Sequence, residues 1–88
     1  MKLSILVVDD SLSSRKLYGS YLRDQYTLTI VSSGAEALEQ AGNRVFDLYI
    51  TDLMMPGMDG ITFIKKLRKL HPDAGVIVVS QTEEIDLA

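Results

Sequence analysis

Residues 49–60 read YITDLMMPGMDG, an apolar stretch that ends in an acid and continues into a loop containing Pro56. Tyr, Ile and Thr favour extended backbone, whereas Pro and Gly favour turns. This motif predicts a buried strand over residues 46–51, followed by a loop that begins at Asp52. The fold and the candidate chemistry of the chain both follow from this junction.

Strand-like and helix-like segments alternate along the rest of the chain. Because strands separated by helices favour parallel pairing with right-handed crossovers, we predict an α/β fold with a doubly wound parallel sheet. No linker or repeat interrupts the pattern, so residues 1–88 are expected to form one domain. The predicted strands span residues 5–8, 26–31, 46–51 and 75–80, the predicted helices span residues 13–23, 33–41 and 59–71, and residues 82–88 are expected to begin a further helix.

Each predicted helix carries apolar residues at spacings of three and four, as expected for one face packed against a sheet. Ser33 and Glu36 stand at the spacing of a capping box, Asp59 can cap the third helix, and Pro72 ends it. The apolar residues are Leu17, Tyr18, Tyr21 and Leu22 in the first helix, Ala35, Leu38 and Ala41 in the second, and Ile61, Ile64, Leu67 and Leu70 in the third.

The composition excludes several classes of protein. The chain has no Cys, so it has no disulfide and no thiolate metal site. Its net charge of −3 argues against direct nucleic-acid binding, which needs a basic surface. Its apolar runs are too short to span a bilayer, and no signal peptide is recognisable. We therefore expect a cytoplasmic protein.

Three acids follow two of the predicted strands at their C-terminal ends. Asp9 and Asp10 come directly after residues 5–8, and Asp52 comes after residues 46–51. Ligands of open α/β sheets bind outside the carboxyl ends of neighbouring strands. If these two strands are neighbours, the three carboxylates converge, and Mg²⁺ would relieve their mutual repulsion. Taken singly, Asp9 and Asp10 are more often a solvated loop start or a helix N-terminal charge pair than a metal site, and Asp52 is more often a turn residue.

With residues 7–11 (VVDDS), 49–60 and 76–80 (VIVVS) considered together, the whole chain resembles receiver domains of two-component response regulators. The resemblance implies a flavodoxin-like fold with five parallel strands in the order 2-1-3-4-5. The chain ends at Ala88, before the fifth strand and last helix of that family. We therefore expect the order 2-1-3-4, with the fifth strand and last helix missing.

The resemblance also implies roles for individual residues. Asp52 would accept a phosphoryl group, and Asp9 and Asp10 would hold Mg²⁺ together with the Asp52 side chain and the Met54 carbonyl. Ser80 would be the switch hydroxyl that turns towards the phosphoryl oxygens. The donor would be a sensor histidine kinase or a phosphotransfer protein, and an output domain or downstream protein would read the change. Such a domain modifies itself and is not a turnover enzyme.

The sequence departs from the family pattern at two points. Gln81 stands where a small residue is usual, which leaves the rate of dephosphorylation open. The family's fifth-strand Lys is missing, and Arg15 is the nearest cation, which we interpret as an exposed helix charge. The alternative is therefore a pseudo-receiver, an interaction or dimerisation module without productive phosphotransfer. An acyl-phosphate hydrolase is set aside, because Met54 stands where its second acid would be.

The fourth predicted strand, residues 75–80, would lie at an edge of this sheet. Its apolar side chains occur in succession, which is typical of a strand covered on both faces. An uncovered edge exposes free N–H and C=O groups that pair readily with another chain. We therefore expect self-association through this strand.

Overall fold

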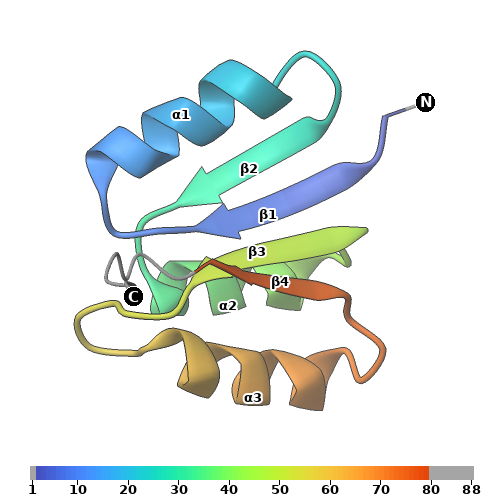
Figure 1. Ribbon diagram of the computed structural model, residues 1–88. Coiled ribbons are helices and arrows are strands. Elements are labelled where there is room, and N and C mark those ends of the chain that lie inside the picture. The colour runs from blue at the N-terminus through green and yellow to red at the C-terminus, as the bar shows by residue number, and fades with distance from the viewer. Residues whose placement is uncertain (1, 80–88) are drawn as a thin grey trace, which may run out of the picture.

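The computed structural model describes residues 2–79, in which four strands alternate with three helices (Figure 1). The predicted alternation is confirmed, with boundaries shifted by a residue or two, and the helix predicted over residues 82–88 lies outside the described residues. The order is β1 (Ser4–Val8), α1 (Leu12–Leu22), β2 (Thr27–Val31), α2 (Gly34–Asn43), β3 (Leu48–Asp52), α3 (Gly60–Leu70) and β4 (Val76–Val79).

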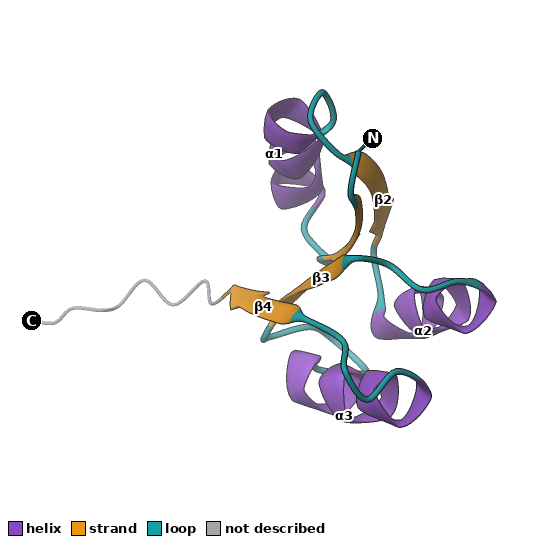
Figure 2. Cartoon of the chain, turned by 90° about the vertical axis from the view of Figure 1, so that its right-hand side faces the viewer, coloured by secondary structure: helices purple, strands orange, loops and turns teal. Residues whose placement is uncertain are grey.

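The strands form one parallel sheet in the order β2-β1-β3-β4, as the sequence predicts. β1 lies between β2 and β3, so that Val8 pairs with Val31 on one side and with Thr51 on the other. α1 covers one face of the sheet, and α2 and α3 cover the other (Figure 2). The fold is therefore an α/β doubly wound sheet.

Side-chain caps start all three helices. The Ser11 hydroxyl accepts from the Ser14 amide, the Ser33 hydroxyl from the Glu36 amide, and the Asp59 carboxylate from the Thr62 amide. The caps predicted at residues 33 and 59 are confirmed. Each satisfies one backbone donor that a helix leaves unpaired at its start, which is typically worth about 1 kcal/mol. The Glu36 carboxylate bonds Ser32 rather than Ser33, so the reciprocal half of the capping box is displaced by one residue.

β1 divides the core into two halves because its side chains alternate between the faces of the sheet. Leu6 and Val8 belong to the cluster under α2 and α3, and Ile5 and Val7 belong to the cluster under α1. All four side chains are buried, as expected for a central strand of a parallel sheet.

The predicted buried faces of α2 and α3 are partly wrong. Ala35 is exposed, and Ala37 is buried in its place; likewise Ile61 is about half exposed while Phe63 is fully buried. The reason is that α2 and α3 contribute to one apolar cluster as well as packing on the sheet. Each helix therefore turns its buried stripe towards its neighbour, a rotation that spacing along the chain cannot reveal.

The predicted apolar face of α1 is only half covered in the described structure. Tyr18 and Leu22 pack against the core, whereas Leu17 is more than half exposed and Tyr21 is 73% exposed. These four side chains line an open groove of about 400 Å³ between α1 and β4, which ends at Asp9. The helix therefore contacts the sheet along a narrow stripe.

β4 is the outer strand of the described sheet, and its central residues Ile77 and Val78 are each nearly half exposed. These exposed side chains fit the edge position predicted for residues 75–80. The self-association inferred from that position stays a prediction. Among residues 2–79, no helix is both long and apolar enough to cross a membrane.

The connection from β3 to α3 brings backbone unusually close to the end of β3. Gly57 has a φ of +78°, a left-handed conformation that glycine adopts without strain. The Gly60 amide donates to the Leu53 carbonyl at 3.0 Å, and a Cβ on Gly60 would overlap the Asp52 carbonyl oxygen. A glycine at residue 60 therefore allows α3 to begin directly beside Asp52.

We expect opposite effects from adding the same methyl group at two glycines. Gly60→Ala should lower the free energy of unfolding by about 1–3 kcal/mol, because α3 has to shift away from β3. Gly42→Ala lies on the exposed side of α2 with no atom within 4 Å of the added Cβ, so it should raise stability by about 0.5–1 kcal/mol. Denaturant unfolding monitored by circular dichroism measures both. Equal effects would contradict the close approach at Gly60.

Candidate metal and phosphoryl site

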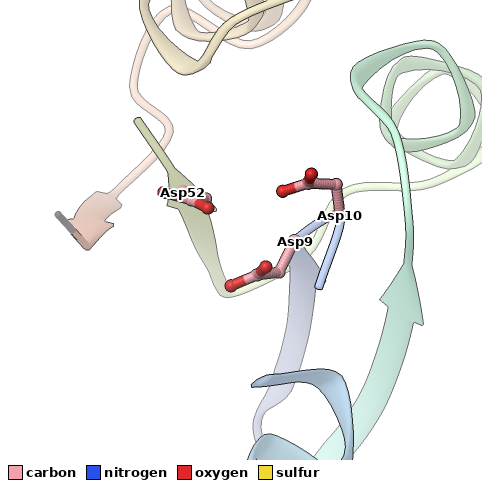
Figure 3. Close-up of side chains that lie close together, drawn as sticks. All are labelled: Asp9, Asp10 and Asp52. Atoms are coloured by element: carbon pink, nitrogen blue, oxygen red, sulfur yellow. The ribbon is translucent and has the colours of Figure 1, made fainter. Parts of the chain in front are cut away.

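Three carboxylates from two neighbouring strands meet at the C-terminal edge of the sheet (Figure 3). Asp52 ends β3, and Asp9 and Asp10 follow β1. Because Val8 and Thr51 pair across these strands, the acids that follow them emerge side by side. One oxygen from each carboxylate lies within 4.8 Å of one from each of the others. The predicted convergence of the three acids is confirmed.

The three acids differ sharply in exposure. Asp9 is 1% exposed and Asp52 is 3% exposed, whereas Asp10 is exposed to solvent. The side chains of Asp9 and Asp52 lie on the same face of the sheet as Val7 and Ile50, the face that α1 covers. The site formed by Asp9, Asp10 and Asp52, called the acidic pocket below, is therefore a partly buried cluster of carboxylates in which Asp10 is the exposed member.

Hydrogen bonds hold the two buried acids in place. The Asp9 carboxylate accepts from the Ser11 amide at 2.9 Å, and the Asp9 main-chain carbonyl accepts from Arg15 Nη1 at 2.9 Å. The Asp52 carboxylate accepts a longer bond, 3.3 Å, from the Met54 amide. Asp9 is thus held more tightly than Asp52, whose carboxylate keeps acceptor capacity for another group.

Burial raises the pKa of the Asp9 carboxyl above its ordinary value, and the negative charges of Asp52 and Asp10 raise that pKa further. The hydrogen bond from Ser11 and the positive charge of Arg15 lower the pKa and only partly offset these effects. Burial likewise raises the pKa of Tyr18 on α1, and the charges of Asp9 and Asp52 add to the effect. The pocket therefore carries an excess of negative charge.

A hard divalent cation would neutralise this excess. Mg²⁺ prefers carboxylate and carbonyl oxygens, keeps several waters and is usually bound through one or two carboxylates. The three Asp side chains supply that donor set, and the exposure of Asp10 leaves room for water and for a phosphate group. The residues present therefore fit a Mg²⁺ ion.

The remaining predicted site residues are Met54 and Ser80, and Arg15 is the nearby cation. The Met54 amide contacts Asp52 and its side chain is 72% exposed, so residue 54 lies beside the pocket; the role of its carbonyl stays a prediction. Ser80, the predicted switch hydroxyl, and Gln81 lie outside the described residues. The interpretation of Arg15 as an exposed helix charge is wrong, because its guanidinium is partly buried and hydrogen-bonded at the site. Helical spacing carries no signal of this contact, because the bond joins a helix side chain to the backbone that precedes the helix.

Comparison with known proteins identifies the class. Residues 5–88 match the family model described as "Response regulator receiver domain", and the chain belongs to that family. It is 37% identical over 87 residues to the transcriptional regulatory protein ZraR of Escherichia coli O157:H7, covering 98% of this chain and 20% of that protein. The chain thus spans about a fifth of the length of the curated relative.

Solved structures of related proteins have the same fold. The chemotaxis protein CheY4 of Vibrio cholerae aligns with a TM-score of 0.84 at 32% identity, covering 89% of this chain and 68% of that one. The receiver domain of the histidine kinase CKI1 from Arabidopsis thaliana, in complex with Mg²⁺ and BeF₃⁻, aligns with a TM-score of 0.83 at 26% identity, covering 96% and 68%. The fold and its strand order are therefore those of a receiver domain, and the cluster of Asp9, Asp10 and Asp52 fits a metal site at the edge of this sheet.

Because the pKa of Asp9 is raised, we expect the free energy of unfolding to depend on pH when no divalent cation is present. A raised pKa stabilises the fold at pH values below the ordinary carboxyl pKa, and this stability is lost as pH rises through the raised value. Asp9→Asn keeps the acceptor for Ser11 and removes the charge. At neutral pH in a chelator, this variant should melt several degrees above the wild type, and the gap should close below about pH 4.

Asp10→Asn is the matched control, because it removes the same formal charge from an exposed side chain. Its melting temperature should rise less than that of Asp9→Asn. Differential scanning calorimetry across pH measures both variants. Identical melting temperatures for wild type and Asp9→Asn at neutral pH would show that burying the Asp9 charge does not destabilise the fold.

Proposed function

We propose that this chain is a phosphorylation-controlled signalling domain in which Asp52 accepts a phosphoryl group in the presence of Mg²⁺. The observation that carries the proposal is the meeting of three carboxylates within 4.8 Å at the C-terminal edge of a receiver-family sheet. A metal-assisted acidic pocket at this place suits phosphoryl transfer, because the ion stabilises the negative charge of the transferring group.

Asp52 is the nucleophile in this proposal. The carboxylate ends β3, directly before the loop, and the hydrogen bond from the Met54 amide is long at 3.3 Å. A carboxylate oxygen forms a P–O bond while the P–N bond of a phosphohistidine breaks, and the departing imidazole nitrogen takes up a proton. The product is an acyl phosphate on Asp52.

The neighbouring acids hold the ion. Asp10 is the exposed member of the acidic pocket, so we assign direct coordination to Asp10 and a contact through water to buried Asp9. The Asp52 side chain and the Met54 carbonyl complete the protein ligands. Bound Mg²⁺ would offset the repulsion among the carboxylates and orient the phosphate oxygens. We propose Ser80 as the hydroxyl that responds to phosphorylation.

The proposed partners follow from the chemistry of an aspartyl phosphate. We propose a phosphohistidine as the donor, carried by either a sensor histidine kinase or a phosphotransfer protein. Phosphorylation adds charge and three strong acceptor oxygens, which can shift a two-state surface that a partner recognises. Because ZraR is a transcriptional regulatory protein, we propose that an output domain or a downstream protein reads that surface. We further propose a cytoplasmic location.

Incubation with acetyl phosphate and Mg²⁺ should add one phosphoryl group to the wild-type chain, measured by intact mass. Asp52→Asn should abolish the adduct, whereas Asp73→Asn, an exposed acid after α3, should leave it unchanged. The adduct should disappear rapidly in base, as acyl phosphates do. Modification that persists in Asp52→Asn would refute the assignment, and Mg²⁺ binding without any modification would favour the pseudo-receiver alternative.

Mg²⁺ binding should depend on Asp10 more than on Asp9. Asp10→Asn should weaken the Mg²⁺ affinity by about tenfold or more, because a direct ligand loses its charge, and Asp9→Asn should weaken it less. Isothermal titration calorimetry measures the dissociation constants, with Asp73→Asn as the control for a general loss of negative charge. Equal Mg²⁺ affinity in wild type and Asp10→Asn would contradict the shared pocket.

A further inference from the structure

Arg15 occupies a place in α1 where a cation is electrostatically unfavourable. It lies in the fourth position of the helix, and its amide makes the first intrahelical bond, to the Ser11 carbonyl at 3.0 Å. The positive end of the helix dipole lies here, and it repels a cation. A cation at this position therefore indicates a favourable interaction elsewhere that offsets the repulsion.

That interaction is a hydrogen bond to the peptide that joins the two N-terminal acids. Arg15 Nη1 donates to the Asp9 main-chain carbonyl at 2.9 Å, in a partly buried setting. The guanidinium thus binds between Asp9 and Asp10 instead of pointing into solvent. Hydrogen bonds from a charged donor are stronger than those between neutral groups.

Three contacts together fix the Asp9 residue. Its amide donates to the Val31 carbonyl at 3.2 Å, its carboxylate accepts from the Ser11 amide, and its carbonyl accepts from Arg15. Of the three groups that bond Asp9, two are backbone groups and the third is the Arg15 side chain, which reaches back from α1. The peptide that carries Asp10 is therefore held by β2, by the loop and by α1.

Asp10 depends on this fixed peptide more than the other two acids do. Its side chain is exposed, whereas Asp9 and Asp52 are enclosed by their surroundings. The direction of an exposed side chain is set mainly by its own backbone. Metal sites lose affinity when the groups that orient their ligands are removed.

We propose that Arg15 is a positioning residue of the Mg²⁺ site: its guanidinium holds the Asp9–Asp10 peptide so that the Asp10 carboxylate stays directed at the pocket. The inference rests on the proposed function, since it names a residue that serves the same ion. Arg15 acts through Asp10 and contacts neither the ion nor the phosphoryl group in this account.

The charge of Arg15 and its hydrogen bond have opposite effects on Mg²⁺ affinity. A cation beside the pocket repels the incoming ion, so removal of the charge alone would tighten binding. Loss of the hydrogen bond frees the Asp10 backbone and would weaken binding. A weaker affinity after neutralisation of Arg15 therefore reports the loss of positioning, because the electrostatic effect has the opposite sign.

Lys16 offers a matched control on the next residue. It carries the same charge and is exposed on α1. Arg15→Gln should weaken Mg²⁺ affinity by about three- to tenfold, whereas Lys16→Gln should leave it unchanged or slightly tighter. Arg15→Lys, which keeps the charge and one donor, should fall between wild type and Arg15→Gln. Titration calorimetry at a temperature where circular dichroism shows every variant folded measures these constants.

A second measurement needs no ion. In a chelator, amide exchange at Ser11 should be several-fold faster in Arg15→Gln than in Lys16→Gln, because the loop that Arg15 holds opens more often. Mg²⁺ affinity in Arg15→Gln equal to or tighter than wild type would overturn the inference, and so would unchanged exchange at Ser11. Failure of the wild type itself to bind Mg²⁺ would instead refute the proposed function, a separate result from either of these.

Discussion

The parallel pairing of β1 with β3 is the constraint on which the rest of the structure depends. These strands are far apart in sequence, and their register places Val8 opposite Thr51. Both strands end at the same edge of the sheet, so the acids that follow them are brought together without any long loop. The pairing also makes β1 and β3 the buried centre of the described sheet, where rigid packing on both faces limits how far the carboxylates can move apart.

The same pairing creates an electrostatic conflict that the fold resolves only in part. Two nearly buried carboxylates and an exposed third lie in one pocket, and burial together with like charge raises the pKa of Asp9. One amide reaches the Asp9 carboxylate and one guanidinium reaches its backbone, and neither neutralises the pocket. A bound divalent ion would recover the free energy lost to this repulsion and would thereby couple stability to ion binding. Apolar residues in place of these carboxylates would give a more stable domain, but one without a metal site.

Close packing connects the acidic pocket to the opposite helical layer. The Asp52 carbonyl lies against Gly60 at the start of α3, and Met58 in the intervening loop packs against Gly34 at the start of α2. The loop after Asp52 therefore contacts the first turns of two helices. The contact with Gly60 lies within a few bonds of the Asp52 carboxylate, in a region where tight packing transmits small shifts. The face of the sheet that α1 covers is packed less closely, since the groove between α1 and β4 leaves Leu17 and Tyr21 largely exposed.

Local patterns were sufficient to predict the alternation of elements, the caps at Ser33 and Asp59, and the three acids at strand ends, because each depends on residues close together in the chain. The strand order needed the family resemblance, since periodicity does not say which strands are neighbours. The packing of α2 against α3 decided that Ala37 and Phe63, not Ala35 and Ile61, would be buried. The role of Arg15 is likewise tertiary: its side chain has a partner only because α1 turns back beside the end of β1. Contacts between segments distant in sequence carry no periodic signal, so the folded chain alone reveals them.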